Sequence, residues 1–198
     1  MANDRTEKKS RKQEILDAAL ACFTEHGIDA TTVEMIRERS GASVGSLYHH
    51  FGSKESIAAA LYVESLAGHH ALQKDMLARA KTAEDGIRAA VRAYVDWISG
   101  NPEKARFVLY SRSAISKSDA GAALLEHSRA QAGEILQWFQ PHIAAGRMKK
   151  LPREVYGSLI IGPAHDYARL WLSGRAKTDI KSYRDLFADA AWAAVRPE

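Results

Sequence analysis

A short run near residue 45 has side chains suited to contacting DNA. Gly45, Ser46, Tyr48 and His49 stand close together, with no carboxylate among them that a phosphate backbone would repel. Hydroxyl and imidazole groups can hydrogen-bond base edges and phosphates, and a glycine lets the backbone approach a partner closely. Lys54 follows shortly afterwards and offers a cation to a phosphate. The run therefore predicts a nucleic-acid interface.

The same stretch also satisfies the hydrolase pattern G-x-S-x-G, from Gly41 to Gly45 with Ser43 in the centre. That chemistry requires a strand before the serine, whereas the residues before Gly41 have helical spacing. No pattern typical of a buried parallel strand occurs elsewhere in the sequence. We therefore expect no enzymatic activity, and we interpret the glycine as a turn residue and the serine as a helix cap.

Metal and redox chemistry have weaker support than DNA binding. The adjacent pairs His49-His50 and His69-His70 project in different directions on a helix, and no cysteine or paired carboxylate completes either set as a metal site. Cys22 lies in an apolar helical stripe, which favours a core position over a redox sensor. We therefore expect no metal and no other cofactor.

The composition is that of a globular protein. The 198 residues include 46% hydrophobic and 26% charged side chains, with a net charge of +4. The longest unbroken apolar run, 57–63, is far shorter than the roughly 20 residues of a membrane span. Residues 1–60 carry 8 Lys and Arg against 9 Asp and Glu, and so have no excess of positive charge. The basic cluster within them is confined to 5–12. No apolar signal core follows that cluster, and we expect a cytoplasmic location.

Helical periodicity runs through the whole sequence and predicts an all-α fold of about nine helices. The expected N-terminal helices are one from Ile15 to Gly27, one from Thr31-Thr32 to Ser40-Gly41, one from Ser43 to about His50, and a long one from Lys54 towards Ala80. The second and third, joined by the turn at Gly41, make a helix-turn-helix arrangement whose second helix can lie in a major groove.

Longer helices are expected in the remainder of the chain. They are one with a stripe from Ile87 to Ile98, one from Pro102, one from Asp119 through Phe139, one from Pro152 to Gly174 interrupted at Pro163, and one from Tyr183 to Val195. The sequence therefore predicts an all-α architecture with a small N-terminal unit and a larger helical part.

The stretch from Ile15 to about Ile57 resembles the TetR (tetracycline-repressor-like) family of bacterial transcriptional regulators. The residues that carry the resemblance are Ala18-Ala19, Phe23, Gly27, Thr31-Thr32-Val33, Ile36, Gly41-Ala42-Ser43, Gly45, Leu47-Tyr48-His49-His50-Phe51 and Ser53-Lys54-Glu55. The sequence departs from the family pattern at Arg37, where a small apolar residue is usual, and at Ser40, where alanine is usual. The remainder of the chain matches the family in architecture alone.

The resemblance implies two domains and a function. Residues 1–53 would form the helix-turn-helix DNA-binding domain, and 54–198 the helical effector-binding and dimerisation domain. The chain would be a ligand-responsive repressor in the bacterial cytoplasm, associated with the nucleoid, that binds a palindromic operator as a homodimer and is released by a small-molecule effector. The DNA-contacting residues would be Thr32, Ser43, Val44, Gly45, Ser46, Tyr48, His49 and Lys54.

Aromatic residues are concentrated in the second part, where they either line an effector pocket or fill a core and a subunit interface. Candidates for the pocket are Tyr94, Trp97, Phe107, Tyr110, Tyr156, His165 and Tyr167. We assign dimerisation to the last two helices, about 153–173 and 181–195, through Leu159, Leu170, Trp171, Leu186, Phe187, Ala190, Ala191 and Ala194.

Two other functions remain compatible with the sequence. One is a DNA-binding regulator that is switched by a protein partner. The other is a small-molecule-binding helical protein whose helix-turn-helix does not bind DNA.

Overall fold

The computed structural model describes residues 10–116, 122, 126, 133 and 136–198, and these residues contain helices and no strand. The elements are α1 (Arg11–Ala30), α2 (Val33–Ser40), α3 (Val44–Phe51), α4 (Lys54–Ala78), α5 (Ala83–Gly100), α6 (Pro102–Ile115), α8 (Arg153–Ile160), α9 (Gly162–Leu172), the short 3-10 helix η1 (Ile180–Tyr183) and α10 (Arg184–Val195). Residues 136–144 are also helical. The all-α prediction is confirmed, while the predicted helix start at Asp119 lies outside the described residues.

The helix ends follow local sequence signals. Ser43 and Ser53 cap α3 and α4 by accepting backbone hydrogen bonds from Ser46 and Ser56. Gly41 ends α2 in the left-handed conformation, with φ of 63°, which a residue with a Cβ adopts at a cost. The break expected at Pro163 is also present, because α8 ends at Ile160 and α9 starts at Gly162.

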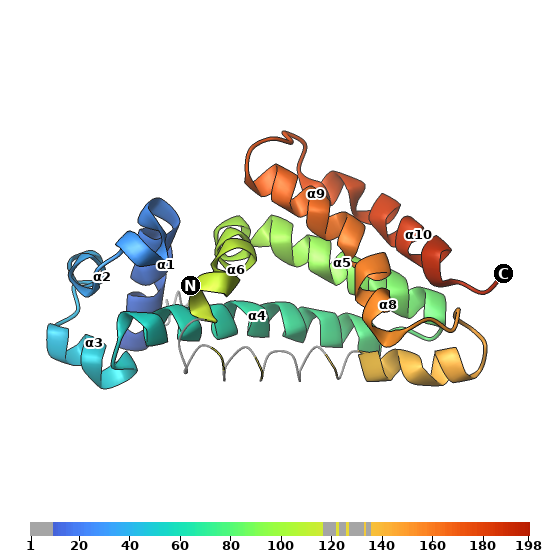
Figure 1. The fold of residues 1–198 in the computed structure, drawn as a ribbon, viewed down its shortest axis with the longest axis horizontal. Coiled ribbons are helices and arrows are strands. Elements are labelled where there is room, and N and C mark those ends of the chain that lie inside the picture. Colours follow the sequence, from blue (N-terminus) through green and yellow to red (C-terminus); the bar gives the residue numbers. More distant parts are fainter. Residues whose placement is uncertain (1–9, 117–121, 123–125, 127–132, 134–135) are drawn as a thin grey trace, which may run out of the picture.

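The long helix α4 connects the two parts of the molecule. In Figure 1, α1, α2 and α3 gather at its N-terminal end, and α5 lies along the rest of it beneath α9 and α10. The helix α5 is the centre of the larger part, since Ile87, Val91, Val95 and Ile98 are fully buried between these layers. Within the described ranges, every helix is too short or too polar to span a lipid bilayer.

Candidate functional site

The helix α3 presents an exposed face at one end of the molecule (Figure 1). Leu47 is buried and anchors the helix to α2 and α4, while Val44 and Tyr48 are 47% and 54% exposed. Gly45 and His49 are exposed as well, and Ser46 is half-buried. Large apolar side chains in solvent are costly in a free protein, so this face is suited to cover a partner surface.

The small core beneath α3 holds it rigidly. Apolar side chains from four helices meet there, namely Ile15, Leu16, Ala19, Phe23, Ile36, Leu47 and Ile57. Cys22 is buried with them, which confirms its predicted core position. Arg39 of α2 forms a two-point ion pair with Glu25 of α1, with nitrogen–oxygen distances of 2.8 and 2.6 Å, and this pairing lowers the pKa of Glu25. The unit can therefore dock as one body.

The two residues expected to hold phosphates, Thr32 and Lys54, have defined roles without DNA. The Thr32 hydroxyl accepts a hydrogen bond from the Met35 backbone N–H at 3.2 Å and caps α2, and the side chain is exposed. The Lys54 ammonium donates to the backbone oxygens of Ile28 and Asp29 at 2.8 and 3.2 Å. Lys54 thus binds carbonyls at the C-terminal end of α1, a position that favours a cation.

Arg37, which departs from the family pattern, is not a free cation. Its Nε donates to Glu34 Oε1 at 2.8 Å on the exposed surface of α2. A phosphate contact by Arg37 would compete with this pair.

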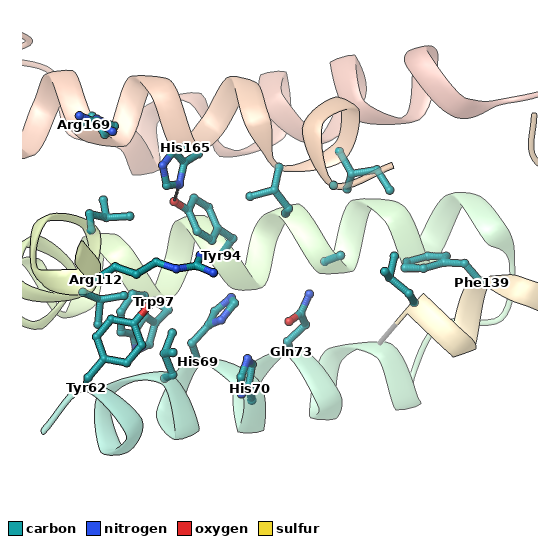
Figure 2. Close-up of a pocket in the computed structure, with 18 residues that line it drawn as sticks. Tyr62, His69, His70, Gln73, Tyr94, Trp97, Arg112, Phe139, His165 and Arg169 are labelled. Carbon is teal, nitrogen blue, oxygen red and sulfur yellow. Dashed lines mark hydrogen bonds between the residues drawn. The ribbon is translucent and has the colours of Figure 1, made fainter. Parts of the chain in front are cut away.

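A cavity of about 700 Å³ lies between the long helices of the larger part (Figure 2). This volume is within the range of pockets that enclose drug-sized ligands. Its walls come from α4, α5, α6, α8, α9 and the helix at 136–144, and they are mostly apolar. The lining residues are Tyr62, Leu66, His69, His70, Gln73, Ala90, Tyr94, Trp97, Val108, Leu109, Arg112, Leu136, Phe139, Gly157, Ile160, Ile161, His165 and Arg169.

Three of the seven pocket candidates line this cavity. Tyr94 and Trp97 come from α5, and His165 comes from α9. The Tyr94 hydroxyl and His165 Nδ1 are 2.9 Å apart, joined by a hydrogen bond across the cavity wall (Figure 2). Their role as ligand contacts stays a prediction.

The other four candidates lie outside the lining of this cavity, although Phe107 and Tyr110 line a second, smaller pocket of about 350 Å³, and their role as ligand contacts stays a prediction. Phe107 stacks on Phe23 of α1, with ring centroids 5.7 Å apart. Tyr110 donates to the backbone oxygen of Arg169, Tyr156 to that of Lys149, and Tyr167 to that of Thr178. Each tyrosine hydroxyl is therefore bonded to a backbone carbonyl, as is usual for a tyrosine at a packed position.

The helix α4 contributes to this cavity, which was not expected from the sequence. Tyr62, Leu66, His69 and Gln73 recur at helical spacing along one face of α4, and Figure 2 shows the three labelled polar residues pointing toward α5. The signal in the sequence was the presence of polar residues on a face of α4 whose other residues are apolar. Arg112 of α6 and Arg169 of α9 were missed as well.

Burial keeps His69 neutral. Its ring packs against Tyr94 and Trp97, with centroids 5.7 and 5.5 Å apart, and Nε2 is enclosed without a hydrogen-bond partner among the described residues. Removal from water, with a smaller contribution from neighbouring His70, lowers the pKa of His69 to about 4.

We expect His69 to make the fold acid-sensitive. In the unfolded chain its pKa is about 6.5, so on acidification the unfolded state binds the proton first, and stability falls between about pH 6.5 and pH 4. The expected loss between pH 7 and pH 5 is about 2 kcal/mol. Urea unfolding at both pH values would measure it. His69→Gln should remove most of this difference, and an unchanged difference would contradict the assignment.

The residues assigned to a dimer interface are exposed or half-buried, with one exception. Leu186 is 62% exposed, Ala190 is exposed, and Leu159, Leu170, Trp171, Phe187 and Ala194 are half-buried. These seven remain candidates for a subunit contact. Ala191 is only 1% exposed, because its side chain points into the core of its own chain, where α10 packs on α5 and α8. The assignment of Ala191 to the interface is therefore wrong.

Among the described residues, the side chains that could indicate a metal site or a serine hydrolase do not assemble into such a site. In the part of the chain that the structure covers, no group of three His, Cys, Asp or Glu side chains is placed to hold a metal ion. Ser43, the central serine of the G-x-S-x-G pattern, follows α2 and caps α3. No strand precedes it, as a nucleophile of that type would require.

Comparison with known proteins gives consistent results. The family "Bacterial regulatory proteins, tetR family" matches residues 15–61. The transcriptional repressor AcnR of Corynebacterium diphtheriae is 29% identical over 150 residues, which cover 73% of this chain and 71% of that protein. The transcriptional repressor KstR2 of Rhodococcus jostii is 50% identical over 56 residues, 28% of each chain.

Solved structures share this fold over most of the chain. A TetR family transcription regulator from Marinobacter aquaeolei aligns with a TM-score of 0.79 and 20% identity, covering 95% of this chain and 96% of that one. FadR of Bacillus subtilis, solved in complex with stearoyl-CoA, aligns with a TM-score of 0.79 and 18% identity, covering 90% and 96%.

Proposed function

We infer that the chain, whose residues 15–61 match the tetR family of bacterial regulatory proteins, is a DNA-binding transcriptional regulator. On this premise, we propose that it acts as a homodimeric repressor that binds a palindromic operator and is released when a small molecule occupies the cavity. The observation that carries the proposal is the exposed face of α3, which a rigid three-helix core holds at one end of the molecule. This activity would place the protein in the bacterial cytoplasm, at the nucleoid.

The exposed face of α3 is suited to a major groove. Val44 can contact a thymine methyl group, while Ser46 and His49 offer hydrogen bonds to base edges. Tyr48 and the flanking residues Thr32, Ser43 and Lys54 would contact the phosphate backbone, which sets the position of the helix but not its sequence preference. Gly45 lets the helix approach closely.

The two proposed domains, 1–53 and 54–198, are in direct contact, and this contact supports a route from cavity to DNA. The helix α6 contributes Val108, Leu109 and Arg112 to the cavity wall, and its Phe107 stacks on Phe23 of α1. The helix α4 lines the cavity with Tyr62 and other residues and begins at Lys54, which binds the end of α1.

The response to a ligand would be a shift between two populations. A ligand that favours a different position of α4 and α6 would move α1 and, with it, α3. In a dimer, such a movement would change the distance between the two recognition helices, which must match successive major grooves about 34 Å apart.

Two alanine variants would test the proposed DNA contacts. Tyr48→Ala is expected to weaken binding to all DNA sequences by a similar factor, because its proposed partner is a phosphate. Ser46→Ala is expected to change discrimination at one base pair by about 1 kcal/mol. Gel shifts with the chain's own upstream DNA and single-base operator variants would measure both. Identical profiles for the two variants would contradict these roles.

Gel shifts, together with thermal-shift measurements, separate this proposal from the other two functions. A protein that binds no upstream DNA would be a ligand-binding protein alone. A protein that binds DNA but shows no thermal shift with any small molecule would be switched by a protein partner or not at all.

A further inference from the structure

The charged side chains among the described lining residues of the cavity are all basic. Among the described residues that line it, Arg112 and Arg169 carry a fixed positive charge, and none is an aspartate or a glutamate. Both arginines lie at the same end of the cavity, Arg112 reaching toward Tyr94 and Arg169 standing beside His165 (Figure 2). That end therefore favours an anion.

Several other arginines of the larger part are engaged by acidic side chains or backbone carbonyls. Arg88, Arg92 and Arg184 form ion pairs with Asp189, Asp185 and Asp96 respectively. Arg106 donates to the backbone oxygen of Leu172 at 2.6 Å.

Neither cavity arginine has a comparable side-chain partner. The Arg169 guanidinium lies 5.5 Å from the centre of the Tyr110 ring. No ion pair with a carboxylate joins Arg112 or Arg169 to another residue of the described ranges. Two guanidinium groups thus remain available to a ligand, and their planar donors match carboxylate and phosphate oxygens.

The other end of the cavity is apolar. Phe139 marks it in Figure 2, and Leu136, Ala90 and Ile160 also contribute hydrocarbon surface to the lining. A ligand body that fills this space would bury apolar area without leaving polar atoms unpaired.

The polar residues of the interior add no opposing charge. Burial lowers the pKa values of His69 and His165 and raises that of Tyr94, so all three side chains are neutral near pH 7. A cationic ligand would meet two arginines and no carboxylate among the described lining residues.

We infer that the effector is an amphipathic anion: an elongated apolar molecule whose carboxylate or phosphate group lies at the end of the cavity that Arg112 and Arg169 line. The apolar body extends along α4 and α5 toward Phe139. This inference rests on the proposed function, because it takes the cavity as the effector site.

Four probes with the same alkyl chain would test the inference: dodecanoate, dodecyl phosphate, dodecanol and dodecyltrimethylammonium. Their binding to the full chain without DNA would be measured below the micelle concentration from the fluorescence of Trp97 and the other tryptophans, and by calorimetry. We expect at least one anion to bind more tightly than dodecanol, and dodecyltrimethylammonium to bind least. The comparison of dodecanoate with dodecyl phosphate identifies the preferred head group.

Arginine variants would locate the head group. Arg112→Gln and Arg169→Gln are each expected to weaken binding of the preferred anion about tenfold, because a hydrogen bond to a charged group is lost, and to leave dodecanol binding unchanged. Arg175→Gln is the matched control, since Arg175 is exposed and outside the cavity lining. It should bind the anion as the wild type does.

Several results would overturn the inference. They are equal affinity for dodecanoate, dodecyl phosphate and dodecanol, tighter binding of the cation, no binding of any probe, or arginine variants that match Arg175→Gln. Gel shifts on the same protein keep the two proposals separate. Operator binding without anion binding refutes the effector class alone, whereas arginine-dependent anion binding without operator binding refutes the DNA-binding role alone.

Discussion

Leu186→Arg is expected to convert the proposed dimer into folded monomers and to lower operator affinity by about a hundredfold or more. Among the described residues, Leu186 is the most exposed of the large hydrophobic side chains, and it lies on α10 beside half-buried Phe187. A charge at the centre of an apolar subunit contact would be desolvated without a partner. A separated protomer binds only one half-site. It therefore loses the gain in affinity that comes from binding two half-sites together, which is on the order of 10²- to 10⁴-fold.

Sedimentation and gel shifts would measure the two effects, and urea unfolding would show that the protomer remains folded. Ala78→Arg introduces the same charge at an exposed position near the end of α4 and serves as the control. A Leu186→Arg protein that remains dimeric and binds its operator normally would place the interface elsewhere.

Ala191→Arg is expected to have a different consequence, namely loss of the folded protomer. The Ala191 side chain is buried where α10 packs on α5 and α8, so a long charged side chain would both overpack the core and bury a charge without a partner. We expect the free energy of unfolding to fall by about 4 kcal/mol or more, a large share of the total stability of a domain.

A residue on the same helix supplies a matched control. Ala193 is exposed and is not among the candidates for the subunit contact, so Ala193→Arg should change the stability of the protomer by no more than about 0.5 kcal/mol. Urea unfolding of the two variants, followed by circular dichroism, measures this difference. Equal stability of the two variants would show that α10 is rotated from the position described.

The recognition unit could be predicted from the sequence because its signals are local. Ser43 and Ser53 hydrogen-bond backbone groups three residues ahead, and Gly41 adopts the left-handed conformation that ends α2. Each of these interactions depends on residues adjacent in the chain, so sequence patterns identify them directly. The same patterns predicted α3 to within a residue at its C-terminal end, Phe51 instead of about His50.

The cavity could be predicted only in part. An apolar stripe with aromatic residues on α5 indicated Tyr94 and Trp97, but Phe107 and Tyr156 have the same residue types and face elsewhere. Phe107 stacks on Phe23, which is remote in the sequence, and Tyr156 bonds to Lys149. A ring in a core and a ring at a cavity have the same preference for burial, so composition does not distinguish them.

The sequence by itself determined the all-α class, the helix-turn-helix and the face of α3 that is exposed to solvent. The tertiary structure decided which side chains meet across helices: that α4 supplies Tyr62 and His69 to the cavity, and that Ala191 faces inward while Ala190 faces outward. The physical reason is that successive residues of a helix point in directions about 100° apart, so two adjacent residues can lie on different faces of the helix. The long-range packing of whole helices sets that rotation.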